Sequence, residues 1–439
     1  MQLVAYGAQD IYLTGDPQIT FFKVVYRRHT NFTMESVSQT FTGSQAFGGK
    51  STVIVSRNGD LVTRGLLEVD VAAMTTTSSS GAGWVRELGH FLIKTVQVDI
   101  GGQQIDKHYG EWLSIWNQLT LPSAKQDGYN AMIGNTAAMT TEGSFGYSNT
   151  GDSTGATAGS YYVTGNGTPA YHLFVPLQFW FNRNPGLALP LIALQFHEVK
   201  FQFEFRPLSD LYRGAYSGTA PTLSNMELWL DYIYLDTDER RRFAKTAHEY
   251  LIEQLQFTGQ ETFGAGASGS DSFRLSFNHP VKFLAWILRR PTSNDPTTYR
   301  DSLDWTDYSG TAMLSGSAAN NILGVGAYAQ YGDNPVSVAR LVLNGHDRMS
   351  QRKGNYFRYV QPYYHFPRIP AHVINVYSFA LNPAEHQPSG TCNMSRIDNA
   401  TMYITLTSAC TSSHLIEIYA VNYNVLRITS GMGGIAFSN

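Results

Sequence analysis

The chain has little charge, no basic excess and no long apolar run, and each shortage excludes a class of protein. Only 15% of its 439 residues are charged, and 31 basic against 34 acidic side chains leave a formal net charge of −3. Direct binding to nucleic acid or anionic lipid needs a basic surface, so we expect neither. No stretch approaches the roughly 18 apolar residues of a membrane-spanning helix. Met1–Gly7 also lacks the basic and apolar regions of a secretory signal, which predicts a soluble protein made in the cytosol.

Cysteine and metal-ligand patterns are equally scarce. Cys392 and Cys410 are too few for a disulfide framework, and we expect them to be buried thiols in a reducing compartment. None of the twelve histidines has the spacing of a metal site. No GxSxG elbow is present, and the carboxylates are scattered along strand-like segments. We therefore predict no catalytic residue, no metal and no cofactor.

Short motifs that bind nucleotides or metals are present only in incomplete form. Gly264–Gly269 match GxGxxG, but strand-like Ser272–Phe277 follow where a helix is required, so we predict a flexible hairpin loop. Gly43–Ser51 resemble a phosphate-binding loop with five residues between the glycines instead of four, which favours a turn. His197 and His248 each precede a glutamate, yet neither has the second histidine of HExxH.

Aromatic residues and alternating segments are what the chain does have. Aromatics make up 13% of the sequence, with 26 Tyr and 24 Phe, a composition suited to strands and broad contact surfaces. Val199–Arg206 alternate between apolar and polar residues, the two-residue period of a strand with one buried face. Similar alternation occurs at Val96–Ile100, Phe273–Phe277 and Met402–Leu406. Many short strands separated by turns predict an all-β sandwich or jelly roll.

The two halves of the chain repeat one another in order, which indicates two domains of about 200 residues. Five short segments match collinearly, and the offsets jump where one half carries a Gly/Ser/Thr-rich insertion. The matched pairs are Thr33–Val37 with Leu251–Leu255, Asn58 with Asn278, Ile100–Gly102 with Leu343–Gly345, Phe181–Asn182 with Leu381–Asn382, and Asp231–Leu235 with Asn422–Leu426.

Only a few short helices interrupt the strands. Trp112, Ile115, Trp116 and Leu119 recur at helical spacing, and we expect this helix to cover the first sandwich. We predict a second helix over residues 238–247. It lies between the two repeats, so we expect it to connect them. Two stretches, 123–170 and 291–335, lack sustained periodicity and predict long surface loops.

Four N-glycosylation sequons occur, and Asn166, Asn393 and Asn399 are the candidate acceptors. The fourth begins at Asn31. A chain without a secretory signal would not normally meet the host enzymes that read sequons. Asn166 lies in the first long loop, and its setting favours exposure most.

Many ordered blocks of this sequence closely resemble the major capsid proteins of nucleocytoplasmic large DNA viruses, with the algal-virus branch nearest. The blocks are spread over nearly the whole chain, and the similarity is lost mainly in the two long loops. They are Gln2–Asp10, Tyr12–Arg28, Ser56–Leu61, Gly101–Tyr109, Pro185–Leu194, His248–Leu255, Gln387–Asn393 and Tyr423–Ile428.

The resemblance implies a structural virion protein and not an enzyme. It implies two tandem eight-stranded antiparallel jelly rolls, a double jelly roll, with three subunits closing into a pseudo-hexagonal capsomer of an icosahedral shell. The expected organisation is an N-terminal arm at 1–29, a first jelly roll at 30–236, a linker at 237–248 and a second jelly roll at 249–439. The expected location is the virion capsid, assembled in the host cytoplasm.

The same resemblance implies partners beyond other copies of the chain. The arm would lie on the inner side and contact minor capsid proteins through Ile19, Phe21, Phe22 and Tyr26, part of an apolar run that a free arm could not easily leave in water. An internal viral membrane would lie nearby, without insertion of this chain. Outer loops would carry glycans.

Two other functional classes share the predicted fold. A glycan hydrolase built from two sandwiches would line a groove with carboxylates and aromatics, but the missing secretion signal and missing carboxylate or histidine clusters weigh against it. A carbohydrate-binding attachment protein would form spikes instead of a lattice.

Overall fold

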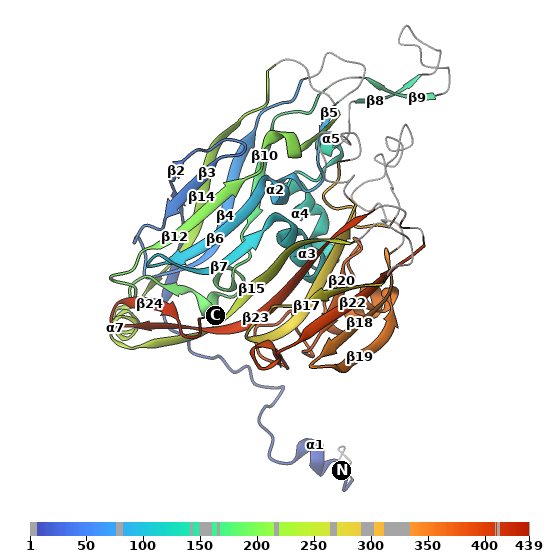
Figure 1. The fold of residues 1–439 in the computed structure, drawn as a ribbon. Helices are drawn as coiled ribbons and strands as arrows, with labels where there is room; N and C mark the ends of the chain where they lie inside the picture. Colours follow the sequence, from blue (N-terminus) through green and yellow to red (C-terminus); the bar gives the residue numbers. More distant parts are fainter. Residues whose placement is uncertain are drawn as a thin grey trace, which may run out of the picture.

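The computed structural model shows an all-β chain with two jelly rolls side by side (Figure 1). It describes residues 7–75, 82–140, 144–148, 160–164, 167–214, 219–263, 270–290, 303–310, 334–408, 410 and 413–438. The candidate acceptor Asn166 and the GxGxxG segment 264–269 lie outside these ranges.

The first roll is made of two five-stranded antiparallel sheets. One has the order β1 (Phe32–Gln39), β14 (Leu223–Leu235), β4 (Leu61–Val71) and β10 (Tyr171–Pro176), with β11 (Leu189–Pro190) beside β4. The other has the order β2 (Phe41–Gly43), β3 (Lys50–Ile54), β12 (Val199–Phe205), β6 (Ile93–Ile100) and β7 (Gln103–Tyr109). Two small two-stranded antiparallel sheets pair β5 (Ala82–Trp84) with β13 (Tyr212–Gly214), and β8 (Ser144–Ser148) with β9 (Ser160–Thr164).

The second roll repeats this architecture. Its first sheet runs β15 (His248–Phe263), β23 (His414–Thr429), β17 (Pro280–Arg289) and β20 (Asn375–Ser378), with β21 (Cys392–Asn393) on β17 and β24 (Met432–Ile435) on β23. Its second sheet runs β16 (Ser270–Arg274), β22 (Ala400–Leu406), β18 (Val336–Leu343) and β19 (His346–Lys353). Each roll has eight main strands, which can be numbered 1 to 8 along the chain. They are β1, β3, β4, β6, β7, β10, β12 and β14 in the first roll, and β15, β16, β17, β18, β19, β20, β22 and β23 in the second. With this numbering, both rolls have the order 1-8-3-6 in one sheet and 2-7-4-5 in the other. The predicted double jelly roll is therefore confirmed.

Helices and turns occupy the connections. In the first half these are α1 (Ile11–Thr14), α2 (Leu88–Leu92), α3 (Gly110–Thr120), η1 (Ser123–Lys125), α4 (Gln126–Met132), α5 (Ala137–Thr140), α6 (Trp180–Arg183), η2 (Pro185–Leu187) and η3 (Leu208–Asp210). Helix α7 (Thr237–Lys245) lies between β14 and β15 in the chain. In the second half η6 (Tyr356–Val360) continues into α9 (Gln361–His365), and η7 (Met394–Arg396) follows β21.

The five repeated segments lie at equivalent places in the two rolls. The clearest pair is the turn between the fourth and fifth main strands, where Gly101 and Gly102 have φ of 60° and 84°, and Asn344 and Gly345 have φ of 50° and 79°. Both central residues of each turn are left-handed, as a tight hairpin with a right-handed strand twist requires. The repeated segments of the sequence therefore correspond to a repeated fold.

Strand alternation in the sequence predicts the buried faces well. In β12 the residues Val199, Phe201, Phe203 and Phe205 are buried, while Lys200, Gln202 and Glu204 are more accessible. Gly43–Ser51 form the predicted turn, because β2 pairs with β3 across it. The segment Gly264–Gly269, predicted as a hairpin loop, lies outside the described residues. The strands that flank it do not pair with each other: β15 pairs with β23, and β16 pairs with β22 in the opposite sheet.

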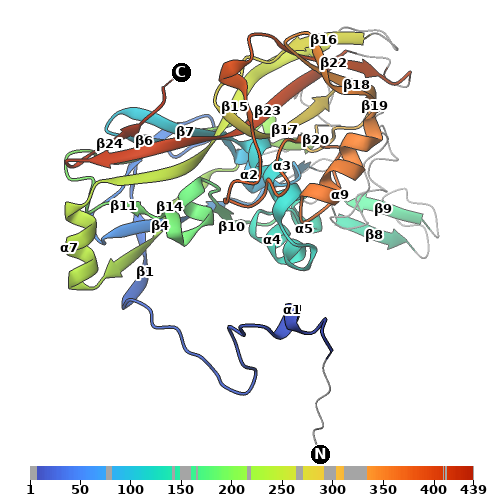
Figure 2. The same cartoon turned by 90° about the horizontal axis from the view of Figure 1, so that it is seen from below.

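Helix α3 forms where the apolar spacing predicts it but has a different partner. Trp112, Ile115 and Trp116 pack against Phe283 and Ala285 of β17 in the second roll. Figure 2 shows α3 between the two rolls. Helical spacing reveals an apolar face without revealing which surface covers it, so the expected lid on the first roll is instead a junction element.

Both predicted surface loops contain buried structure. Within 123–170, Tyr129 of α4, Ile133 and Met139 of α5 are buried. Within 291–335, the described segment 303–310 is buried along its whole length. The prediction failed here because short polar segments can satisfy their own polar groups: Asp304 Oδ1 accepts hydrogen bonds from Thr306 N and Oγ1, at 2.9 and 2.7 Å.

Candidate assembly surfaces and the junction between the rolls

The arm residues predicted to contact a partner are exposed. Ile19, Phe21, Phe22 and Tyr26 are 68%, 89%, 98% and 87% exposed. Figure 1 shows the arm leaving the end of the molecule opposite to β8 and β9. An apolar run this exposed is typical of a segment that is covered in an assembly.

A buried ion network joins the rolls around Glu253 of β15. Arg183 of α6 donates from Nη2 to Glu253 Oε2 at 2.7 Å, and Lys282 of β17 donates from Nζ to Oε1 at 2.9 Å. His386 Nδ1 lies 3.2 Å from the same Oε1. Burial opposes ionisation, but the attraction of Arg183, the His386 hydrogen bond and the attraction of Lys282 outweigh it, so the pKa of Glu253 lies below its usual 4.5. The guanidinium of Arg183 also lies 4.3 Å from the Trp116 ring centre.

A second buried network crosses the junction near the end of β17. Arg206 of the first roll pairs with Glu111 of α3, and Arg289 pairs with both Glu111 and Glu417. Trp305 lies between the two cations, with its ring centre 4.0 Å from the Arg206 guanidinium and 5.0 Å from that of Arg289. Its indole Nε1 donates to Asp210 O at 2.7 Å. The supposed loop segment therefore closes this junction.

A third contact uses histidines. Glu87, in the left-handed region at φ 52°, has Oε2 2.9 Å from His90 Nδ1 and Oε1 3.3 Å from His372 Nε2 of the second roll. His90 Nε2 lies 2.8 Å from the Tyr129 hydroxyl. Burial opposes ionisation of Glu87, yet both histidine hydrogen bonds hold its pKa well below the usual range. Three separate polar contacts thus fix one roll against the other.

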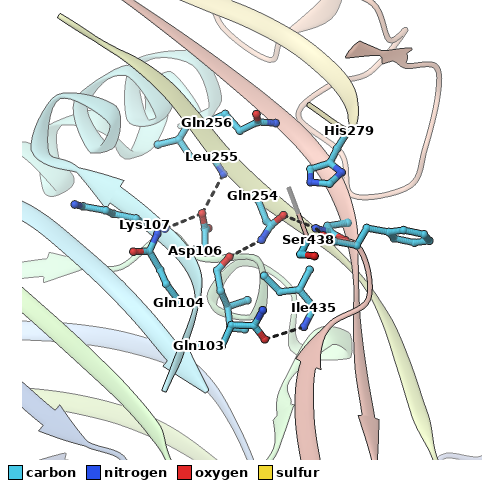
Figure 3. Close-up of a pocket in the computed structure, with 13 residues that line it drawn as sticks. Gln103, Gln104, Asp106, Lys107, Gln254, Leu255, Gln256, His279, Ile435 and Ser438 are labelled. Carbon is cyan, nitrogen blue, oxygen red and sulfur yellow. Dashed lines mark hydrogen bonds between the residues drawn. The ribbon is translucent and has the colours of Figure 1, made fainter. Parts of the chain in front are cut away.

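A polar pocket of about 270 Å³ lies where β7 of the first roll meets β15 of the second (Figure 3). Leu255 N donates to Asp106 Oδ1 at 3.0 Å, and the Gln254 side chain donates to Ile105 O. Asn424 Nδ2 donates to Gln254 Oε1 and to Phe437 O, both at 2.9 Å. These bonds tie the two strands and the C-terminal segment together. The pocket therefore belongs to the junction between the two rolls.

Two of the three candidate glycosylation sites, Asn393 and Asn399, lie among the described residues. Asn393, Asn399 and Asn31 are exposed, whereas Asn166 lies outside the described residues, so its predicted exposure stays a prediction. The Asn393 side chain already accepts a hydrogen bond from Ser395 N at 3.1 Å. Sequence context alone could not rank them, because exposure depends on the folded turn.

The described residues contain no cluster of three or more His, Cys, Asp or Glu side chains that could hold a metal. Among the same residues no helix is long and apolar enough to cross a membrane. Cys410 is buried as predicted, whereas Cys392 is half-buried, and both thiols are free. Burial raises the pKa of the Cys392 thiol.

Comparison with known families and relatives agrees with this architecture. Residues 20–236 match the family described as major capsid protein N-terminus, and residues 239–434 match the large eukaryotic DNA virus major capsid protein family. The major capsid protein of Pyramimonas orientalis virus is 48% identical over 462 residues, covering 100% of this chain and 99% of that protein. That of Paramecium bursaria Chlorella virus 1 is 42% identical over 468 residues, with the same coverage.

Solved structures show the same fold. A chain of the PBCV-1 virus capsid has a TM-score of 0.75 and 37% identity, covering 96% of this chain and 100% of that chain. The Faustovirus major capsid protein, at 15% identity and a TM-score of 0.72, covers 97% of this chain and 94% of its own and shows the fold alone. The chain therefore belongs to the major capsid protein family of large eukaryotic DNA viruses, as a structural component of the virion that associates with neighbouring copies and not as an enzyme.

Proposed function

We propose that three copies of this chain close into a pseudo-hexagonal capsomer and that these capsomers tile an icosahedral shell. The observation that carries the proposal is the pair of jelly rolls with one topology in one chain. Three such chains supply six similar lobes around a threefold axis. A closed ring of this kind needs a heterologous interface, and two diverged rolls provide the two different faces for it.

The junction supports treating both rolls as one building block. Buried ion pairs at Glu253, Glu111 and Glu87 link residues of the two rolls, and α3 packs between them. Ion pairs of this kind require a fixed geometry, because a misplaced partner leaves a buried charge unpaired. We propose the functional division as arm 1–29, first roll 30–236, linker 237–248 and second roll 249–439.

We further propose that the arm contacts minor capsid proteins on the inner side of the shell, close to an internal membrane into which this chain does not insert. Exposure of Ile19, Phe21, Phe22 and Tyr26 supports a role as a partner-binding segment. Assembly would take place in the host cytoplasm. We propose Asn166, Asn393 and Asn399 as carbohydrate acceptors, and peptide mass spectrometry of protein from virions tests each site by its added mass.

Negative-stain microscopy of the purified chain tests the capsomer directly. We expect uniform particles with pseudo-hexagonal outlines, and analytical ultracentrifugation should give the mass of three chains. Obligate interfaces of this type bury more than about 2,000 Å² each, so a stable folded monomer at micromolar concentration would contradict the proposal.

A further inference from the structure

The contact between the two rolls provides a template for the contact between subunits. Within the chain, the outward face of β17 and β23 in the second roll is covered by α3, which follows the fifth main strand of the first roll. The Trp112 ring centre lies 6.2 Å from that of Phe283 and 5.6 Å from that of Tyr419. An aromatic helix of one roll thus packs on the outer sheet of the next.

The corresponding sheet of the first roll is only partly covered by the described part of the single chain: Ala188 and Phe243 pack at Leu61 and Ile233, at one end of the sheet. On β4 and β14 the outward-facing residues Leu66 and Trp229 pair across the strands and are only half-buried. They line a hollow of about 330 Å³ whose polar rim includes Ser36, Arg64 and Asp231. Leu66 and Trp229 are apolar side chains on a sheet face that lies open in the monomer.

The corresponding helix of the second roll exposes its aromatic residues. The segment formed by η6 and α9 follows β19, the fifth main strand, just as α3 follows β7. Tyr359, Val360, Tyr363 and Tyr364 are 42%, 37%, 69% and 69% exposed. Two of these pairs are spaced four residues apart, so they form one stripe on the helical surface. Figure 2 shows α9 next to β20, on the side of the second roll away from β16 and β22.

We propose that the η6–α9 segment of one subunit packs on the β4–β14 face of a neighbouring copy, with Tyr363 and Tyr364 against Leu66 and Trp229. This inference rests on the proposed trimer and names its interface. Six similar rolls arranged around one axis make six similar contacts. Three of these contacts lie within chains and use α3, so the other three, which lie between chains, should use the equivalent helix α9.

The edge strands and their charges support the same pairing. Within the chain, β7 lies beside β15, joined by the Leu255 to Asp106 hydrogen bond. The equivalent strands β19 and β1 are both largely exposed edges in the monomer. Exposed basic residues on β19 are Arg348, Arg352 and Lys353. The outward face of the first roll around Leu66 and Trp229 presents Glu227 and Asp231, with one cation, Arg64, beside them. Opposite charges on the two surfaces favour this register and disfavour contact between like surfaces.

Cysteine cross-linking tests the pairing with substitutions on the surface. Ser36→Cys and Tyr363→Cys are introduced together into a Cys392→Ser background, and trimers are treated with a short bis-maleimide. We expect covalent products of two and three chains and none larger. Each single variant should give no ladder, and an equal mixture of the two single variants, co-assembled, should give two-chain products only.

The outcomes separate this inference from the proposed function. Trimers that sediment normally but yield no cross-link would overturn the interface while leaving the capsomer intact. A monomeric wild-type chain would overturn both. As a second test, Tyr363→Ala with Tyr364→Ala should raise the concentration for half-assembly about tenfold or more, since buried aromatics dominate interfaces. Phe196→Ala, at a 75% exposed aromatic outside both surfaces, is the control and should leave it unchanged.

Discussion

Arg183 of the first roll and Glu253 of the second form an ion pair of 2.7 Å across the junction, with only 3% of the Glu253 side chain exposed. The same carboxylate binds Lys282, which is 1% exposed. One glutamate therefore holds a cation from each roll. Its loss would leave the buried Lys282 with only the Glu385 carbonyl as a hydrogen-bond partner and the Tyr423 ring at 4.9 Å, with no compensating negative charge from Glu253.

Glu253→Gln should consequently destabilise the chain by about 3 kcal/mol, because removing one partner strands a buried charge. Chemical denaturation at one protein concentration measures the change. Glu249→Gln is the matched control on the same strand, since its pair with Arg427 is exposed on both sides, and we expect a loss below about 0.5 kcal/mol. Equal effects of the two substitutions would contradict a structural role for the buried network.

Stability should fall as the pH drops below the ordinary glutamate value. The pKa of Glu253 is depressed in the folded chain, so the unfolded chain binds protons first as pH falls below about 4.5. The stabilisation from the ionised carboxylate is complete above that pH and is lost progressively below it. The difference in melting temperature between wild type and Glu253→Gln should therefore be large at pH 7 and smaller near pH 3. If the difference in melting temperature instead grew as the pH falls, the pKa of Glu253 would not be lowered in the folded chain.

The repeated turns offer a paired test of backbone strain. A methyl group at Gly101 would lie 2.3 Å from His197 Nδ1, whereas at Gly345 it would meet nothing within 4 Å. Both positions have positive φ, so Gly345→Ala should cost about 1 kcal/mol from conformation alone. Gly101→Ala adds a steric clash, and we expect a further loss of about 1–3 kcal/mol. Thermal unfolding measures the stability of both variants. Equal losses of stability in the two would contradict the predicted clash between a methyl group at position 101 and His197.

The sequence predicts the strands and the duplication because both are local patterns. Alternation marks β12, and two left-handed residues mark the turn at Gly101 and its counterpart at Asn344. The junction could not be predicted in the same way. In the sequence, Glu111 and Glu253 look like ordinary helix or strand carboxylates. Only folding brings a cation from the other roll beside each of them, Arg289 beside Glu111 and Arg183 beside Glu253. The burial of 303–310 could not be predicted either, because Asp304 and Asp307 make a short segment look like a surface loop until folding places Arg290 beside Asp307 and the Asp210 carbonyl beside Trp305.

Shortening the first long loop should be tolerated only within definite limits. Deleting 144–164 removes a hairpin whose end residues, Ser144 and Thr164, already face each other, so rejoining costs little. Extending the deletion back to residue 136 also removes buried Met139 and the Thr140 carbonyl that accepts a bond from Arg213. We expect the longer deletion to lose about 2–5 kcal/mol and the shorter to assemble normally. Sedimentation and denaturation of both variants test this, and equal losses would contradict the packing of α5.

Protease protection should reveal which side of the shell the arm occupies. Lys23, Arg27 and Arg28 lie within the exposed apolar run, so trypsin should cut free capsomers there and release the first 28 residues or fewer. In intact particles the inner side is closed to the enzyme, and the same bonds should survive. Mass spectrometry of both samples under one digestion regime reads the result. Cleavage of the arm in intact particles would place it outside and remove the basis for contacts between Phe21 or Phe22 and an inner partner.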